Sequence, residues 1–217
     1  MNMEMLWQNF FNTSTLAVLD SNTAGAAYLF DRRPTRKYIS VGYANDLTQT
    51  TIKVAFDSTQ TVSRVILQNV NWREFRVFYN GATASTLGLT TTCGTTASYW
   101  TGNSETSLYL MFNDTAMTSL SIDIKKTIVA DEEKKCGQLI ISDQQFQFTR
   151  NPDKGGLTPE MRPKEITHTM SDGGTVVFRV RDKIQYALSG THRLSSEITG
   201  LRTVYDTKLP LVFVPFP

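Results

Sequence analysis

The feature that most restricts the fold of this chain is an alternation of apolar and polar residues with a period of two. In the run 51–56, Ile52, Val54 and Phe56 share one face. Similar runs recur along the chain at 65–67, 75–79, 108–112, 120–124, 176–180 and 184–188. Successive side chains of a β-strand point to opposite faces of a sheet, so this pattern predicts strands with one buried face.

The residues between these runs favour turns. Asn80 and Gly81 both tolerate positive φ, which is typical of a tight hairpin turn. Short strands separated by turns predict an all-β fold, a sandwich or barrel rather than βαβ units. From Gly81 to Thr106 the alternation gives way to Thr, Ser and Gly, with Tyr99 and Trp100 inside. We expect a long loop there, and loops of this length usually bind a ligand or pack on a neighbour.

The second part of the chain predicts a smaller β domain with one helix. We place the boundary between the two parts between residues 128 and 129. The run of charged residues that follows, 130–135, is expected to be a solvated turn. A strand pair, 138–142 and 145–149, and a polar excursion over 151–163 follow, and a further strand is expected at 164–169.

A change of period predicts the helix. Ser195 is suited to the N-cap, Glu197 lies in the first turn, and Ile198, Leu201 and Tyr205 share one face. These positions predict a helix over Ser195–Tyr205.

The chain closes with an apolar run, Leu209–Pro217, that is hydrophobic on both faces. A strand of this kind needs cover on two sides, and its prolines suit the edge of a sheet. We therefore expect a neighbouring subunit to cover it. The expected subunit contacts are Leu211, Val212, Phe213, Val214 and Phe216.

The chain shows no motif of a known catalytic type. Its two histidines, His168 and His192, stand at no metal-ligand spacing, and there is no nucleophile elbow, P-loop or dinucleotide fingerprint. Cys93 and Cys136 are expected to be ordinary thiols, with a bridge between them left open. We expect a protein that is not an enzyme.

Other classes of partner are also disfavoured. The net charge is +2, which gives no argument for nucleic acid, and no run approaches the roughly 20 apolar residues of a membrane span. Four carboxylates, Asp20, Asp31, Asp46 and Asp57, stand near strand ends, where calcium remains an alternative, but without EF-hand spacing we expect no metal and no cofactor. The first twelve residues lack the pattern of a secretory signal.

One basic cluster stands out, formed by Arg32, Arg33, Arg36 and Lys37. The aromatic residues that flank it are Tyr28, Phe30 and Tyr38. A solvated loop between strands is one interpretation. The other is a docking patch, either for an acidic partner or for sugar hydroxyls with the aromatics as stacking platforms.

The first half of the chain resembles the discoidin (coagulation factor 5/8 type C, galactose-binding-like) domain. The segments that carry the resemblance are Leu16–Asp20, Tyr28–Arg32, Lys37–Ser40, Thr51–Phe56, Val62–Leu67 and Asn71–Gly81. The resemblance covers about Thr15 to Lys126 and implies a jelly-roll sandwich over 1–128, after an N-terminal arm of about 14 residues. It also implies ligand loops at one end, where many members bind glycans. By position, the candidate loop residues are Asp31, Arg32, Arg36, Tyr99 and Trp100. The chain lacks the terminal disulfide pair of secreted members.

The second half is similar to phage tail domains of the distal-tail and tail-tube kind. The similarity lies in a strand, a helix and a Pro-flanked last strand between Pro163 and Pro217. It implies a structural protein of a virion tail that is assembled in the host cytoplasm and contacts other tail proteins. We expect copies of this chain to form a ring, which we take to be a hexamer. The alternative function is a carbohydrate-binding module that attaches to a host surface glycan.

Overall fold

The computed structural model describes residues 3–6, 8–11, 16–18, 24–31, 33, 35–42, 44–80, 85–86, 100–148, 157–169, 175–188, 195–207 and 212–214. The chain forms two compact units. The larger holds Glu4–Gln147 together with Leu209–Pro215, and the smaller holds Met1–Met3 and Phe148–Lys208. The expected boundary between 128 and 129 lies within the larger unit.

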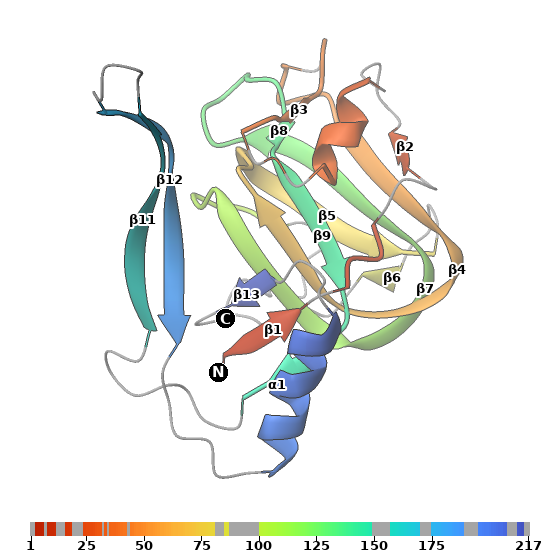
Figure 1. The fold of residues 1–217 in the computed structure, drawn as a ribbon. Helices are drawn as coiled ribbons and strands as arrows, with labels where there is room; N and C mark the ends of the chain where they lie inside the picture. Colours follow the sequence, from red (N-terminus) through yellow and green to blue (C-terminus); the bar gives the residue numbers. More distant parts are fainter. Residues whose placement is uncertain are drawn as a thin grey trace. The chain divides into compact units, whose positions relative to one another are not determined.

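The described elements are mainly strands (Figure 1). In chain order they are β1 Glu4–Leu6, β2 Leu16–Val18, the 3-10 helix η1 Ala24–Leu29, β3 Tyr38–Ile39, β4 Thr50–Gln68, β5 Trp72–Tyr79, β6 Ser85–Thr86, β7 Ser107–Thr127, β8 Lys135–Cys136, β9 Gln138–Ser142, β10 Phe146–Gln147, β11 Leu157–Thr169, β12 Thr175–Leu188, α1 Ser195–Thr207 and β13 Val212–Val214. The predicted all-β class with one α-helix is confirmed, and α1 begins at the predicted residue.

Two long bent strands, β4 and β7, build the sandwich. They are 19 and 21 residues long, so each contains two of the short runs predicted from the sequence. The pairing of β4 with β7 shifts register between Ala55 and Gln60 and again between Val62 and Arg64. The first half of β4 lies beside β2, and its second half lies beside β9. One six-stranded sheet therefore curls over on itself.

The core lies between the two halves of this curled sheet. Ile52 and Val54 from the first half of β4 share one buried cluster with Val65 and Leu67 from its second half. Trp72 and Phe75 of β5 lie in the same cluster, and neither is accessible to solvent. The alternation read from the sequence identifies this inner face.

A second, smaller sheet, in the order β10–β1–β13, belongs to the same unit. Leu6 of β1 packs with Ile66 of β4 and Ile140 of β9, on the face of these strands that points away from the main core. The run Val62–Leu67 of β4 is consequently buried without interruption. A strand covered on both faces loses the simple alternation of buried and exposed positions.

The C-terminal strand pairs within its own chain. In β13, Val212 lies opposite Leu6, Phe213 opposite Met5 and Val214 opposite Glu4. It is the last strand of its sheet, an edge position that agrees with its flanking prolines. Leu211 and Phe216 lie outside the described residues, and the contact of this strand with a second subunit stays a prediction.

The smaller unit contains the antiparallel pair β11–β12 and helix α1. The excursion predicted for 151–163 is wrong for 157–163, which belong to β11. The prolines of β11 fit a two-stranded sheet, because both of its strands are edges. Neither η1 nor α1, the helices of the described residues, is long and apolar enough to cross a bilayer.

Candidate ligand-binding loops

The segment between β2 and β4 supplies two candidate sites. It carries η1 and β3, and β3 pairs with β8, so that Tyr38 lies opposite Cys136. A further backbone bond from Ser40 N to Lys134 O, at 3.0 Å, continues this attachment. The two candidate sites precede and follow β3, at residues 28–37 and 44–47.

The first site is a group of side chains that we call the Tyr28–Arg36 patch, formed by Tyr28, Asp31, Arg33, Arg36 and Lys37. Asp31 Oδ1 accepts a hydrogen bond from Arg33 N at 2.8 Å, and Arg36 N donates to Arg33 O, also at 2.8 Å. Arg36 Cζ lies 5.6 Å from the centroid of the Tyr28 ring, within the range of a cation–π contact. The loop therefore presents a cation and an aromatic ring side by side.

Of the three aromatic residues that flank the basic cluster, one is exposed. Tyr28 is 36% exposed, and it is the one exposed aromatic residue among those whose solvent exposure the structure describes. Phe30 is half-buried and meets Phe11 edge-on, with 5.0 Å between ring centroids. Tyr38 is fully buried in the core. Tyr28 alone among these three has a ring surface that a ligand can reach.

Asp31 acts within the loop rather than at its surface. Its Oδ1 holds the turn, and its Oδ2 is buried without a hydrogen bond among the described residues. The nearest cation among the described residues is Arg36 Nη1, 4.0 Å from Oδ2, and half of the Arg36 side chain is exposed. The geometry makes Asp31 a positioning residue and leaves the Arg36 guanidinium accessible.

The structure places Trp100 against the core of the sandwich. Trp100 is half-buried, and its ring centroid lies 4.8 Å from that of Phe75. The two backbones form a bridge, with Trp100 N donating to Phe75 O at 2.6 Å and Phe75 N to Trp100 O at 3.0 Å. Asp31 and Arg36 thus meet in one patch, whereas Trp100 packs on β5. Arg32 and Tyr99 lie outside the described residues.

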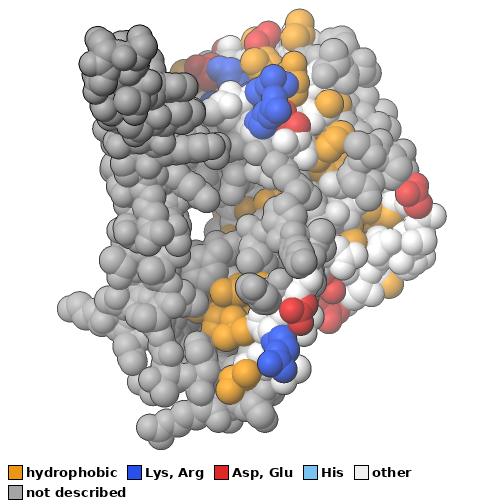
Figure 2. All heavy atoms as spheres, in the orientation of Figure 1, with side chains coloured by type: hydrophobic (Ala, Val, Ile, Leu, Met, Phe, Trp, Pro, Cys, Tyr) orange, Lys and Arg blue, Asp and Glu red, His pale blue; other side chains and the backbone are white. Residues whose placement is uncertain are grey.

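In the space-filling view, Lys and Arg side chains appear next to hydrophobic ones at the upper edge, over β3 and β8 (Figure 2).

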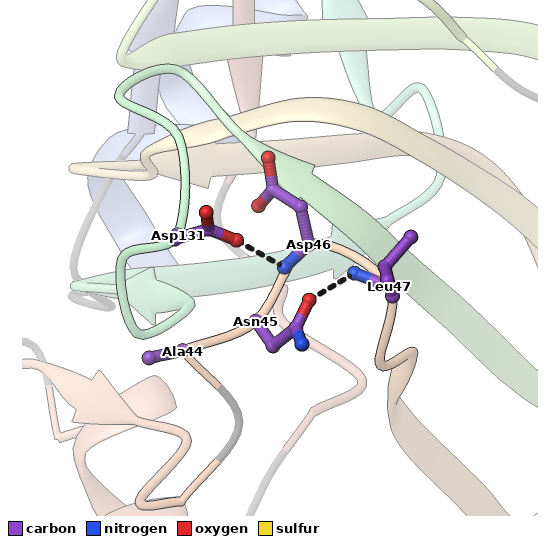
Figure 3. A pocket seen from close by; sticks show the side chains of 5 residues that line it. All are labelled: Ala44, Asn45, Asp46, Leu47 and Asp131. Atoms are coloured by element: carbon purple, nitrogen blue, oxygen red, sulfur yellow. Dashed lines mark hydrogen bonds between the residues drawn. The ribbon is translucent and has the colours of Figure 1, made fainter.

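The second candidate site is an open hollow of about 620 Å³ (Figure 3). Ala44, Asn45, Asp46 and Leu47 line it from one loop, and Asp131 from another. Asp46 N donates to Asp131 Oδ1 at 3.0 Å, and Leu47 N to Asn45 Oδ1 at 2.7 Å. Leu47 is 86% exposed. The hollow offers carboxylate and amide groups but no aromatic ring.

A buried lysine supports this hollow. Lys134 is inaccessible to solvent, and its Nζ donates to Asn45 O at 2.9 Å and Thr48 O at 3.0 Å. Burial lowers the pKa of Lys134, and the charges of Asp46 and Asp131 offset this only in part. The expectation of a solvated turn over 130–135 is therefore wrong at Lys134. Nothing in the charge run distinguishes this lysine, because the partner loop lies 86 and 89 residues earlier in the chain.

The described residues contain no group of three His, Cys, Asp or Glu side chains placed to hold a metal ion. Cys136 is a free thiol, and burial raises its pKa to about 12, a value at which it is not a nucleophile near neutral pH. Cys93 lies outside the described residues.

No protein-family model and no curated protein matches the chain. Among solved structures, a chitosan-binding module of a chitosanase/glucanase from Paenibacillus sp. IK-5 is 18% identical, with a TM-score of 0.46 over 62% of this chain and 98% of that one. The lectin domain of lectinolysin, complexed with Lewis B antigen, is 12% identical, with a TM-score of 0.47 over 63% and 97%. A pectin-binding carbohydrate-binding module is 14% identical, with a TM-score of 0.42 over 60% and 91%.

These similar structures are carbohydrate-binding domains, and nothing in the comparisons points to a phage tail protein. Identities and TM-scores of this size do not assign a ligand to the chain. A ligand has to be inferred from the side chains that the loops expose.

Proposed function

We propose that the larger unit is a carbohydrate-binding module that contacts a glycan through the Tyr28–Arg36 patch. The observation that carries the proposal is the exposure of Tyr28, the one exposed aromatic residue among those whose solvent exposure the structure describes, next to the Arg36 guanidinium. An aromatic ring offers a flat apolar surface to the C–H face of a sugar, and a guanidinium offers planar hydrogen-bond donors to its oxygens.

The resemblance of residues 15–126 to the discoidin domain supports the same proposal, since that family uses loops of a β-sandwich to hold ligands. The patch lies on a connecting segment and not on a strand of the sheet. Binding residues concentrate on such loops because a rigid scaffold positions them while their side chains remain accessible. The patch contains no histidine or cysteine, and recognition requires no reactive group.

The role as a ring-forming tail protein, the first expectation from the sequence, gains no support from the comparisons. β13 already has a partner strand, β1, within its own chain. Location in a virion tail stays a prediction. Attachment to a host glycan is compatible with such a location but does not depend on it.

A glycan array with the purified chain tests the proposal. We expect binding to a defined set of glycans, and we expect Tyr28→Ala to weaken it at least tenfold, which corresponds to about 1.4 kcal/mol. Leu47→Ala is the matched control, because it removes a more exposed apolar side chain from the other candidate site. The proposal would be contradicted if the chain bound no glycan, or if the Tyr28→Ala variant bound glycans as strongly as the unchanged chain does. Loss through Leu47→Ala instead would move the site to the hollow of Figure 3.

A further inference from the structure

We infer that the Tyr28–Arg36 patch selects acidic saccharides, in which an anionic group on the sugar meets the cations of the loop. This inference rests on the proposed function and names the ligand class of the same site. It is carried by the number of cations in the loop, by the absence of an ion pair at Arg33 and Lys37 among the described residues, and by the position of Arg36 at Tyr28.

Positive charge is concentrated in this loop. Between residues 24 and 40 the chain has four cationic side chains, Arg32, Arg33, Arg36 and Lys37, and a single acidic one, Asp31. The loop therefore carries a charge of +3, which exceeds the +2 of the whole chain. Clustered charge of one sign attracts ligands of the opposite sign.

Two of these four cations have no ion pair among the residues that the structure describes. Arg33, Arg36 and Lys37 are all exposed, and among the described residues Arg33 and Lys37 form no ion pair. Arg36 has one acidic neighbour, Asp31, at 4.0 Å. That carboxylate already accepts a backbone hydrogen bond through its Oδ1, so it cannot satisfy three cations.

The position of these cations separates a saccharide from other anions. Arg36 Cζ lies over the ring of Tyr28, 5.6 Å from its centroid, so a pyranose at the edge of this pair contacts the tyrosine and the guanidinium together. A carboxylate at that place accepts paired, charge-assisted hydrogen bonds from arginine. A neutral sugar makes weaker bonds there and leaves the charge of the loop uncompensated.

Affinity electrophoresis of the full chain in gels that contain alginate tests this inference. The propylene glycol ester of alginate is the matched neutral ligand, because it keeps the polymer backbone and removes the charge. We expect binding to alginate to be at least tenfold stronger than binding to the ester. We also expect it to weaken several-fold as NaCl rises from 50 to 500 mM, because salt screens exposed charges.

Two variants locate the effect. Arg36→Gln is expected to weaken binding of both ligands but alginate far more, so that the tenfold preference for alginate over the ester falls below twofold. Arg73→Gln removes one exposed cation from β5, outside the patch, and is expected to change neither affinity. Thermal unfolding of each variant, with a midpoint close to that of the unchanged chain, shows that the fold is intact.

Dextran sulfate, compared with dextran, separates a sugar site from a general polyanion site. Retardation by dextran sulfate that is as strong as that by alginate and is unchanged in Tyr28→Ala would overturn the inference. A chain that binds neutral glycans, binds alginate and its ester equally well, and is unaffected by Arg36→Gln would also overturn the inference. That result would leave the proposed function standing. A chain that binds no glycan of either kind would contradict both.

Discussion

At the scale of single residues, Glu4 holds the N-terminal strand to the sandwich. Its carboxylate is inaccessible to solvent and accepts hydrogen bonds from Arg64 Nε at 2.9 Å and Arg64 Nη2 at 3.0 Å. Tyr109 Oη also donates to it, as do Gln144 Nε2 at 3.3 Å and Gln147 Nε2 at 3.1 Å. A buried charge is tolerated when it is paired with an opposite charge and fully hydrogen-bonded, and the Glu4 carboxylate meets both conditions.

The pKa values of the partners reflect the same arrangement. Burial lowers the pKa of Arg64, but its interactions with Glu4 and Tyr109, the hydrogen bond to Glu4 first among them, more than offset it, so the pKa lies above its usual value. Burial raises the pKa of Tyr109, and the hydrogen bond to Glu4 raises it further. Both groups therefore keep their protons, and remain donors to Glu4, across the physiological range.

We expect Glu4→Gln to lower the free energy of unfolding by about 3–5 kcal/mol, because it leaves the buried Arg64 cation without an anion. Urea denaturation measures the change. Glu105→Gln, at an exposed position, is the matched control and is expected to stay within about 0.5 kcal/mol. A Glu4→Gln protein as stable as this control would show that the pair contributes little to holding β1.

At the scale of elements, Lys134 joins two connecting loops. The segment after β7 carries it, and the segment before β4 supplies its acceptors, the carbonyl groups of Asn45 and Thr48. Asp46 completes the junction, because its Oδ1 accepts hydrogen bonds from Thr127 N at 3.1 Å and Thr127 Oγ1 at 3.0 Å. At Asp131 the chain turns with φ of 59°, a left-handed conformation that Asp tolerates better than most residues. The hollow of Figure 3 depends on this junction.

Replacement of Lys134 by Met tests the junction, since Met keeps an apolar stem and removes the donors. We expect a loss of about 1–3 kcal/mol, the usual contribution of hydrogen bonds from a charged donor, together with faster amide hydrogen exchange over residues 44–49. Lys135→Met is the control next in sequence. Its ammonium group lies 3.4 Å from Glu132 in a partly exposed pair, which is worth about 1 kcal/mol or less. Equal effects of the two variants would argue against a special role for Lys134.

At the scale of the whole molecule, the two chain ends meet in the larger unit. β1 lies between β10 and β13, so residues near both ends of the chain share one small sheet. This pairing satisfies the backbone of the apolar C-terminal strand on one side, and β13 remains the edge strand. A second chain can add to the free edge of β13 without disturbing β1, or β13 can be exchanged between subunits in place of its pairing with its own β1.

A disulfide between Met5→Cys and Phe213→Cys distinguishes these alternatives, because the two residues lie directly opposite each other in the register of β1 and β13. In a Cys93→Ser background we expect oxidation to give an intrachain bond, visible as a faster monomer band on a non-reducing gel. A covalent dimer or a ladder would instead show that β13 is exchanged between subunits. Met5→Cys alone controls for unspecific coupling.

The amino-acid sequence was sufficient to predict the local elements. The period of two identified the strands of β4, β5 and β7 and their inner face, and the change of period identified α1. Asn80 has φ of 58°, the conformation for which it was singled out as a turn residue. The basic loop with aromatic neighbours was also visible as a candidate site. These features depend on the intrinsic preferences of neighbouring residues, which a sequence carries directly.

Contacts between residues far apart in the chain required the tertiary structure. It showed that short apolar runs join into the long strands β4 and β7, that Tyr28 is exposed while Tyr38 is buried, and that Trp100 packs on Phe75. The burial of Lys134 and the pairing of β13 with β1 belong to the same class. Local pattern determines which backbone conformation a segment prefers, but the burial of a side chain depends on which distant segment covers it. Only the folded arrangement of all segments settles that.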